Sequence, residues 1–99
     1  MATYIVLGNF TDQGRTAGNI PQRRARAHEL AKGLGVSFTA YVTMGRYDVV
    51  WVVDAPNDES VAKLALSLGA AGNVTTQTMR AFTEAEVDEL IAGLPAPPA

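Results

Sequence analysis

Cysteine is absent from this sequence of 99 residues. Its absence excludes disulfide bonds, thiolate catalysis, thiolate-bound metals and iron–sulfur clusters. Histidine is nearly absent, with His28 as its one example. Methionines aside, a transition-metal site would then have to consist mostly of carboxylates, which is an unfavourable ligand set for such metals. We therefore expect neither a metal nor a cofactor.

An excess of one charge is also missing, since 8 basic and 10 acidic residues give a net charge of −2 at pH 7. This balance offers no extended field to attract nucleic acid or an anionic membrane, so we expect neither partner. No apolar run approaches the length of a membrane-spanning helix. The first residues lack the basic segment and long apolar stretch of a signal peptide. The expected compartment is the cytoplasm.

Apolar residues, in contrast, are abundant for so short a chain. Ninety-nine residues fit one domain, which we place at residues 1–94, followed by a flexible Pro/Ala-rich tail at 95–99. A domain of this size buries only a modest fraction of its surface, yet 47% of the residues are hydrophobic. This surplus indicates a partner subunit.

Four strands and two longer helices are predicted along the chain. Stretches rich in β-branched and aromatic residues predict strands at 3–10, 36–44, 47–54 and 73–82. Apolar residues at helical spacing predict helices that begin near Asn19 and Asp58, each of which is expected to act as an N-cap. The polar segment 11–19 predicts a loop.

A short third helix is predicted near the end of the chain. Thr83 and Glu86 have the spacing of a capping box, and an apolar stripe follows them at Val87, Leu90, Ile91 and Leu94. The helix lies outside the β-α-β-β-α-β order of the preceding elements. It is therefore an addition to the main fold.

The order β-α-β-β-α-β predicts an α+β, ferredoxin-like fold: a four-stranded antiparallel sheet with two helices on one face. The first and third strands are apolar on both faces, which places them in the middle of the sheet. Because two helices cover only one face, a second copy of the sheet is the simplest cover for the other. We therefore expect a sheet-on-sheet homodimer, with further assembly left open. In the alternative, the third helix folds over the open face, although about 10 helical residues cover little of a sheet.

Several motifs together resemble the GYD-domain family. The segment Thr43-Met44-Gly45-Arg46-Tyr47-Asp48 is similar to the T-x-G-x-Y-D motif of that family. Further similar segments are Tyr4-Ile5-Val6-Leu7, Asn9 to Gly14, Ala55 to Glu59, and Leu68-Gly69 with Gly72 to Phe82. The resemblance covers roughly residues 3–90 and implies a ferredoxin-like fold of the dimeric α+β-barrel kind. It implies no particular activity, because fold relatives include monooxygenases, isomerases, cyclases and ligand-sensing domains.

The predicted topology gathers polar side chains at one end of the sheet. Strands one and two run in one direction and strands three and four in the other, so this end collects Asn9, Thr43, Tyr47, Asp48 and Thr75. The loop at 11–19 would lie over the same end as a lid. We predict the mouth of a ligand pocket here.

Three side chains are candidates for catalysis. Asp48 is a candidate general base and Tyr47 a candidate hydrogen-bond donor to an oxyanion. The competing interpretation, which we favour, is that Asp48 binds backbone amides of its own hairpin turn and that Tyr47 lies in the core. His28 is a candidate proton shuttle, but a histidine at the edge of a buried stripe more often simply packs or faces water.

Aromatic and basic residues provide further candidates for ligand binding. Trp51 is expected in the core or at a dimer interface, with stacking on a substrate as the minor alternative. Phe38 and Tyr41 lie on opposite faces of strand two, so one of them faces the helices, and either is a candidate to line an apolar pocket. A basic cluster at Arg23, Arg24 and Arg26 indicates either anion capture or, as we prefer, a solvated face that pairs with Asp12 or Glu29.

Three functions agree with these features. The first is a homo-oligomeric module that binds a small apolar or aromatic ligand. The second is a cofactor-independent isomerase, cyclase or monooxygenase acting on an aromatic or enolisable substrate. The third is a scaffold or interaction protein without a ligand. Whether the chain is an enzyme is left open by the sequence.

Overall fold

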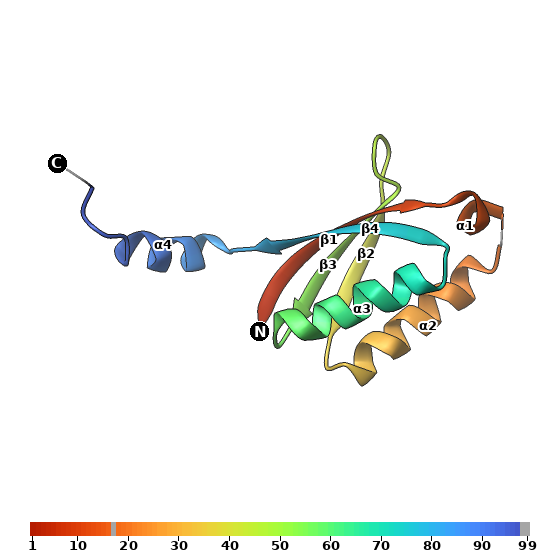
Figure 1. Cartoon of the computed structure of the whole chain (residues 1–99), viewed down its shortest axis with the longest axis horizontal. Helices are drawn as coiled ribbons and strands as arrows, with labels where there is room; N and C mark the ends of the chain where they lie inside the picture. Colours follow the sequence, from red (N-terminus) through yellow and green to blue (C-terminus); the bar gives the residue numbers. More distant parts are fainter. Residues whose placement is uncertain (17, 98–99) are drawn as a thin grey trace.

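The computed structural model describes residues 1–16 and 18–97. Figure 1 shows a curved sheet with helices packed against it and a further helix that extends away from it. In chain order the elements are β1 (Ala2–Phe10), α1 (Asp12–Thr16), α2 (Ile20–Gly33), β2 (Ser37–Val42), β3 (Val49–Ala55), α3 (Asp58–Ala70), β4 (Val74–Ala81) and α4 (Glu84–Ala92).

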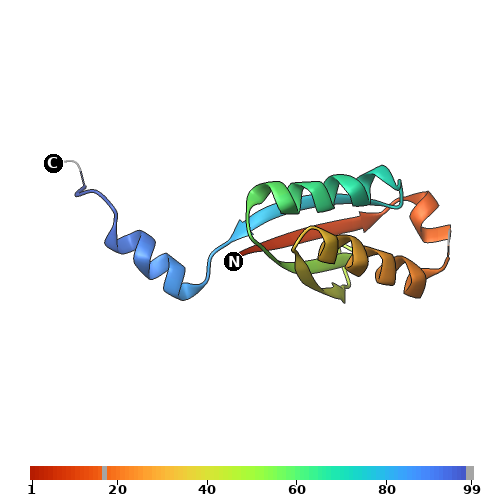
Figure 2. The ribbon, with the colours of Figure 1, turned by 90° about the horizontal axis from the view of Figure 1, so that it is seen from below.

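The four strands form one antiparallel sheet in the order β2-β3-β1-β4. β1 and β3 are central, as their two-sided apolar pattern predicts. Figure 2 shows α2 and α3 on the same face of this sheet. The predicted α+β, ferredoxin-like fold is confirmed.

The core lies between the sheet and the two helices. Tyr4 and Val6 of β1 and Val53 of β3 are buried on the helix face, where they pack with Val61 and Leu64 of α3. Alternate residues of each strand point to opposite faces, so the remaining apolar residues of β1 and β3 point away from the helices. Burying the helix-face side chains stabilises the fold by about 1.5–3 kcal/mol for each large one.

In the described part of the chain, no helix covers the opposite face of the sheet, which is called here the open face (Figure 1). It carries a band of apolar side chains at Ile5, Leu7, Val50, Val52 and Met79. Met79 of β4 is 40% exposed, and Tyr41 of β2, at the other edge of the sheet, is 57% exposed. The third helix of the sequence prediction, α4, does not cover this face, because it extends away from the sheet.

Two of the predicted helix starts differ in detail from the structure. The N-cap of α3 is Asn57, whose side chain accepts a hydrogen bond from the backbone N–H of Ser60 at 2.9 Å. Asp58, the predicted cap, instead accepts a hydrogen bond from the Tyr4 hydroxyl. Asn19 does occupy the N-cap of α2, but its φ is 57° and its side chain makes no cap bond.

The segment predicted as a free loop contains the short helix α1 and is fastened to the rest of the fold. The Thr11 hydroxyl donates to the carbonyl of Gly72 at 2.6 Å, and the Gln13 side chain donates to the carbonyl of Ala71 at 3.2 Å. Gly14 is buried so closely that a Cβ there would lie 1.9 Å from the carbonyl oxygen of Asn73. Residues 11–16 are therefore part of the rigid body, and the lid prediction is wrong for them. Residue 17 lies outside the described residues.

α4 begins with the predicted capping box. The Thr83 hydroxyl accepts from the backbone N–H of Glu86 at 3.1 Å, while the Glu86 carboxylate accepts from the backbone N–H of Thr83 at 3.0 Å. No residue of this helix is buried. Figure 1 shows α4 beyond the end of β4, which accounts for the longest dimension of 58 Å.

Candidate functional site

A groove of about 310 Å³ lies on the helix face of the sheet, between the two packed helices. α2 contributes Ala27 and Leu30 to its walls, and α3 contributes Leu68. The sheet supplies Phe38, Ala40, Val42, Val49 and Trp51. Phe10 and Asn73 close the groove at the end of the sheet where the polar site was predicted. The groove is thus largely apolar and open to solvent.

Trp51 contributes to the floor of the groove. Its ring lies over Gly8 of β1, where a Cβ would come within 2.5 Å of Trp51 Cζ3. Glycine at this position therefore creates the space that the indole occupies. Trp51 lies on the helix face and is half-buried, so it lies within the fold and not on the open face. The structure thus places Trp51 on the core side of the sheet, where it also lines the groove.

Phe38 forms the side of the groove on β2, where His28 of α2 stacks on it. The ring centroids are 4.1 Å apart and the planes are inclined by 10°. His28 is exposed and uses its ring face for this contact. The contact fastens α2 to the sheet, which is the packing role expected for this residue in preference to a proton shuttle.

Arginines form the basic rim of the groove at the start of α2. Arg23 donates to the carbonyls of Gly14 at 2.8 Å and Gly18 at 3.2 Å, so its guanidinium fixes the segment that precedes α2. Arg24 and Arg26 also line the groove. Neither has an ion-pair partner among residues 1–16 and 18–97, and Asp12 pairs with Arg15 instead. The predicted pairing of this cluster with Asp12 or Glu29 is therefore wrong.

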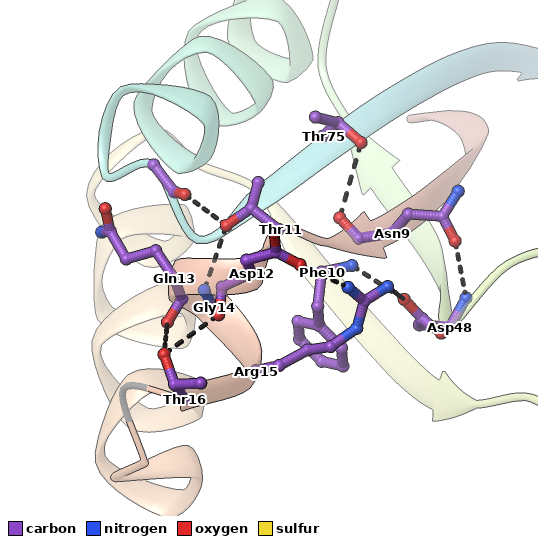
Figure 3. Close-up of polar contacts among 11 residues, drawn as sticks. Asn9, Phe10, Thr11, Asp12, Gln13, Gly14, Arg15, Thr16, Asp48 and Thr75 are labelled. Atoms are coloured by element: carbon purple, nitrogen blue, oxygen red, sulfur yellow. Dashed lines mark hydrogen bonds and ion pairs between the residues drawn. The ribbon is translucent and has the colours of Figure 1, made fainter.

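Asp48 lies at the polar end of the sheet, as predicted, and holds two strands together. Its Oδ2 accepts a hydrogen bond from the backbone N–H of Phe10 at 2.8 Å. Its own N–H donates to the carbonyl of Gly8 at 2.9 Å and to Asn9 Oδ1 at 3.2 Å. Figure 3 shows the contacts of Asp48 with Phe10 and Asn9, with the Arg15 guanidinium between Asp12 and Asp48. The carboxylate binds a backbone amide of β1 and not one of its own turn, which differs from the favoured interpretation.

The remaining polar residues of this end also bind backbone groups. The Thr43 hydroxyl donates to the carbonyl of Tyr47 at 2.6 Å, and the Thr75 hydroxyl lies 3.5 Å from the carbonyl of Asn9 (Figure 3). The structure thus brings Asn9, Thr43, Asp48 and Thr75 together as predicted. Their hydrogen bonds join the ends of the strands.

Tyr47 and Tyr41 lie outside the groove. The Tyr47 hydroxyl donates to the Gln77 side chain of β4 at 3.2 Å, and Tyr47 is half-buried, whereas a core position was favoured for it. Tyr41 is on the open face, because it pairs in register with Val50, which points to that face. Phe38 lies three positions earlier on the same strand and points to the helices instead. Phe38 is therefore the aromatic residue of β2 that faces the groove.

A second polar cluster lies at the other end of the sheet, away from the groove. The hydrogen bond that the Tyr4 hydroxyl donates to Asp58, with burial as the next cause, raises the pKa of Tyr4 above its ordinary value of 10.0. The hydrogen bond from the Thr83 backbone lowers the pKa of Glu86 below 4.5, and the Arg80 guanidinium at 3.2 Å lowers it further. These contacts connect the sheet to the start of α3 and α4.

Several groove residues were not among the predicted site residues. Phe10, Leu30, Ala40 and Val42 have patterns that signal only strand or helix packing in a sequence. The signal that was available is the arginine cluster, because cations in the first turns of a helix oppose the helix dipole. That unfavourable placement indicates a requirement other than helix stability.

The sheet order and the helices on one face define the chain as a ferredoxin-like α+β domain. The chain belongs to the GYD domain family, which matches residues 4–91. It is similar to a protein of Thermus thermophilus named "Glutamine synthetase and cystathionine beta-lyase binding protein". The two are 38% identical over 90 residues, an alignment that covers 88% of this chain and 95% of the relative. No helix in the described part of the chain has the length and apolar character needed to cross a membrane.

Proposed function

We propose that this chain is a homo-oligomeric binding module that holds a small apolar or aromatic ligand in the groove between α2 and α3. The observation that carries the proposal is the groove itself. Its volume of about 310 Å³ and its mostly apolar lining are typical of sites for small molecules. Phe38 and Trp51 offer aromatic surfaces against which a flat ligand packs.

The arginines at the rim suggest the polar part of such a ligand. Arg24 and Arg26 line the groove without an ion-pair partner in the described residues. A guanidinium binds carboxylate and phosphate groups through two parallel hydrogen bonds. A ligand with an apolar body and one anionic group therefore fits the groove best.

The homo-oligomer is proposed from the open face. Ile5 and Leu7 of β1 and Val50 and Val52 of β3 form an apolar band on the two central strands. Each residue is only half-buried within the single chain. Packing two such faces about 10 Å apart removes both bands from water. A sheet-on-sheet homodimer follows as the simplest arrangement.

Binding of another protein is the second candidate. The name of the Thermus thermophilus relative says that it binds glutamine synthetase and cystathionine beta-lyase. The feature of this chain that favours a protein partner is α4, which carries exposed apolar residues and extends beyond the body of the fold. A catalytic role has less support, because the Asp48 carboxylate is already occupied by the Phe10 amide.

The ligand proposal is tested by filling the groove. The probe is anilinonaphthalene sulfonate, an aromatic anion whose fluorescence rises in apolar sites. We expect it to bind and to quench the emission of Trp51, the one tryptophan of the chain. Ala40→Phe, which places a ring in the groove, should weaken binding by roughly tenfold, the factor that corresponds to about 1.4 kcal/mol.

Ala62→Phe is the matched control, because Ala62 lies on the exposed surface of α3 and does not line the groove. It should leave probe binding unchanged. Equal binding by the chain and the Ala40→Phe variant would refute the groove as the ligand site. Native mass spectrometry of the freshly purified protein provides the second readout: a dimer with an excess mass that is lost on denaturation supports the proposal.

A further inference from the structure

We propose that α4 of one chain docks on the basic rim of the groove of a second copy. α4 is amphipathic, with an apolar stripe formed by Val87, Leu90, Ile91 and the following Leu94. These side chains are 38%, 52%, 58% and 66% exposed. A helix with such a stripe gains stability mainly by packing it against a partner surface.

α4 does not reach the groove of its own chain. α4 follows β4 after only Phe82 and Thr83, and two residues span at most about 7 Å. Figure 1 shows that α4 points away from the sheet, whereas the start of α2 lies at the other end of the molecule. Figure 2 shows the same separation from a second direction. The groove that α4 reaches is therefore on another molecule.

Charge identifies the rim of the groove as the receptor. α4 contains four acidic residues, Glu84, Glu86, Asp88 and Glu89, and no basic residue. α2 contains four basic residues, Arg23, Arg24, Arg26 and Lys32, against one acidic residue, Glu29. No other helix of the described chain has a comparable basic excess. Complementary charge of this kind guides association and fixes which surfaces meet.

Two of the acidic residues of α4 lie beside its apolar stripe. Glu84 and Asp88 are four residues apart, so they lie together on one flank of the stripe. On the receptor, Ile20, Leu30 and Val42 form exposed apolar points around the groove, beside Arg24 and Arg26. Val42 is 83% exposed within the single chain. The stripe of α4 covers these points while its acidic flank meets the arginines.

Docking on the rim engages Arg24 and Arg26, which are also the groups proposed to bind the anionic part of a ligand. α4 and an anionic ligand therefore compete for these two arginines. The inference does not rest on the proposed ligand, because it is argued from the exposed stripe of α4 and from the charges of the two helices. In a closed assembly each chain gives one helix and receives one.

The test uses the absence of cysteine, because cysteines introduced in pairs then report a single contact. Two differently tagged full-length chains are co-expressed: one carries Ile91→Cys, the other carries Ile20→Cys, Leu30→Cys or Val42→Cys. The purified mixture is treated with oxidised glutathione, which accepts the two electrons released when the disulfide forms. A disulfide forms only where the two Cα atoms come within about 7 Å. We expect at least one of these three groove positions, called here the rim positions, to give roughly tenfold more heterodisulfide with Ile91→Cys than with Ala85→Cys.

Ala85→Cys is the matched control because Ala85 lies on the opposite side of the same helix. Equal yields from the Ile91→Cys and Ala85→Cys chains at every rim position would overturn the proposal. So would a heterodisulfide between Ile91→Cys and Tyr41→Cys that exceeds all the rim pairs, since α4 would then dock on the open face.

A charge swap tests the receptor independently. In the Ile91→Cys chain, Asp88→Lys should lower the yield of the rim heterodisulfide by roughly two- to fivefold, the range expected for exposed ion pairs. Glu89→Lys makes the same charge change on the side away from the stripe and should have little effect. Arg24→Glu in the rim chain should restore the yield with Asp88→Lys. Two results together would contradict the assignment of the arginine rim. In the first, Arg24→Glu does not restore the heterodisulfide yield; in the second, Glu89→Lys lowers that yield as much as Asp88→Lys does.

Discussion

Gly8 shows how one residue controls the groove. It is buried in the central strand β1, and the Trp51 ring occupies the space above it. Gly8→Ala places a methyl group 2.5 Å from Trp51 Cζ3, so the indole has to move. We expect a loss of about 1–3 kcal/mol in the free energy of unfolding, which is typical of overpacking. Urea unfolding followed by Trp51 fluorescence measures both the loss and the displacement of the ring.

Gly33→Ala is the comparison for this substitution. Gly33 ends α2 and has no atom within 4 Å of an added Cβ. Because alanine favours the helix over glycine, this variant should be neutral or more stable by up to about 1 kcal/mol. Equal free energies of unfolding for the Gly8→Ala and Gly33→Ala variants would show that the Trp51 ring does not require glycine at position 8.

Substitutions at Asp48 test whether its carboxylate stabilises the fold. Asp48→Ala removes the acceptor of the Phe10 amide and should lower the free energy of unfolding by about 1–3 kcal/mol. Asp48→Asn retains a side-chain oxygen and should lower it by less. Urea unfolding of the two variants measures this difference. An Asp48→Asn variant as unstable as Asp48→Ala would mean that the negative charge matters more than the acceptor.

Residues of the polar end were predicted as a group because strand direction alone brings them together. Asn9 is the penultimate residue of β1, Asp48 directly precedes β3, and Thr75 is the second residue of β4. Their hydrogen-bond partners were not predictable in the same way. The Phe10 amide that binds Asp48 is 38 residues away in the chain, and only the register of β1 against β3 places the two side by side.

At the scale of the element, contacts between residues close in the sequence stabilise the start of α4. The capping box joins Thr83 to Glu86, and Arg80 of β4 adds an ion pair to the same carboxylate. These contacts lower the pKa of Glu86. They are formed by residues close in sequence, so the start of this helix was predictable without knowledge of the fold.

The lowered pKa of Glu86 predicts how α4 responds to acid. A carboxyl group whose pKa is lower in the folded state contributes stability above its unfolded pKa, and this contribution is lost as the pH falls through the folded pKa. We therefore expect the first turn of α4 to fray as the pH falls below 4.5, the ordinary value for Glu86. Backbone amide chemical shifts of residues 83–88 followed by NMR measure this change.

Glu86→Gln is the control for the acid response. Glutamine retains a side-chain acceptor for the Thr83 amide but does not titrate. The variant should therefore show a weaker dependence of these shifts on pH between 3 and 6, roughly the range in which an ordinary glutamate titrates. An unchanged pH dependence in the variant would assign the transition to another carboxyl group.

At the scale of the whole molecule, the open face allows the proposed dimer to be tested. Val52 lies on the central strand β3 within the apolar band. In a sheet-on-sheet dimer, Val52→Lys buries an unpaired ammonium, which costs roughly 3–5 kcal/mol and raises the Kd for dimerisation by more than about a hundredfold. Native mass spectrometry across a dilution series measures the shift from dimer to monomer.

Ala62→Lys adds the same charge on the exposed surface of α3 and should leave the dimer intact. A wild-type chain that is monomeric at every concentration would contradict the proposal for the open face. A dimer that survives Val52→Lys would place the subunit interface elsewhere on the molecule.

The sequence by itself determined the four strands, the helices α2, α3 and α4, the order of these elements and the two apolar faces of β1 and β3. Each follows from local periodicity and from turn and cap residues, which act over a few positions in the chain. Only the tertiary structure decided where the groove lies, because its walls combine residues from β1, α2, β2, β3, α3 and β4. It also decided that 11–16 is anchored and that α4 extends outward. These features depend on packing between distant segments, which a periodic pattern does not encode.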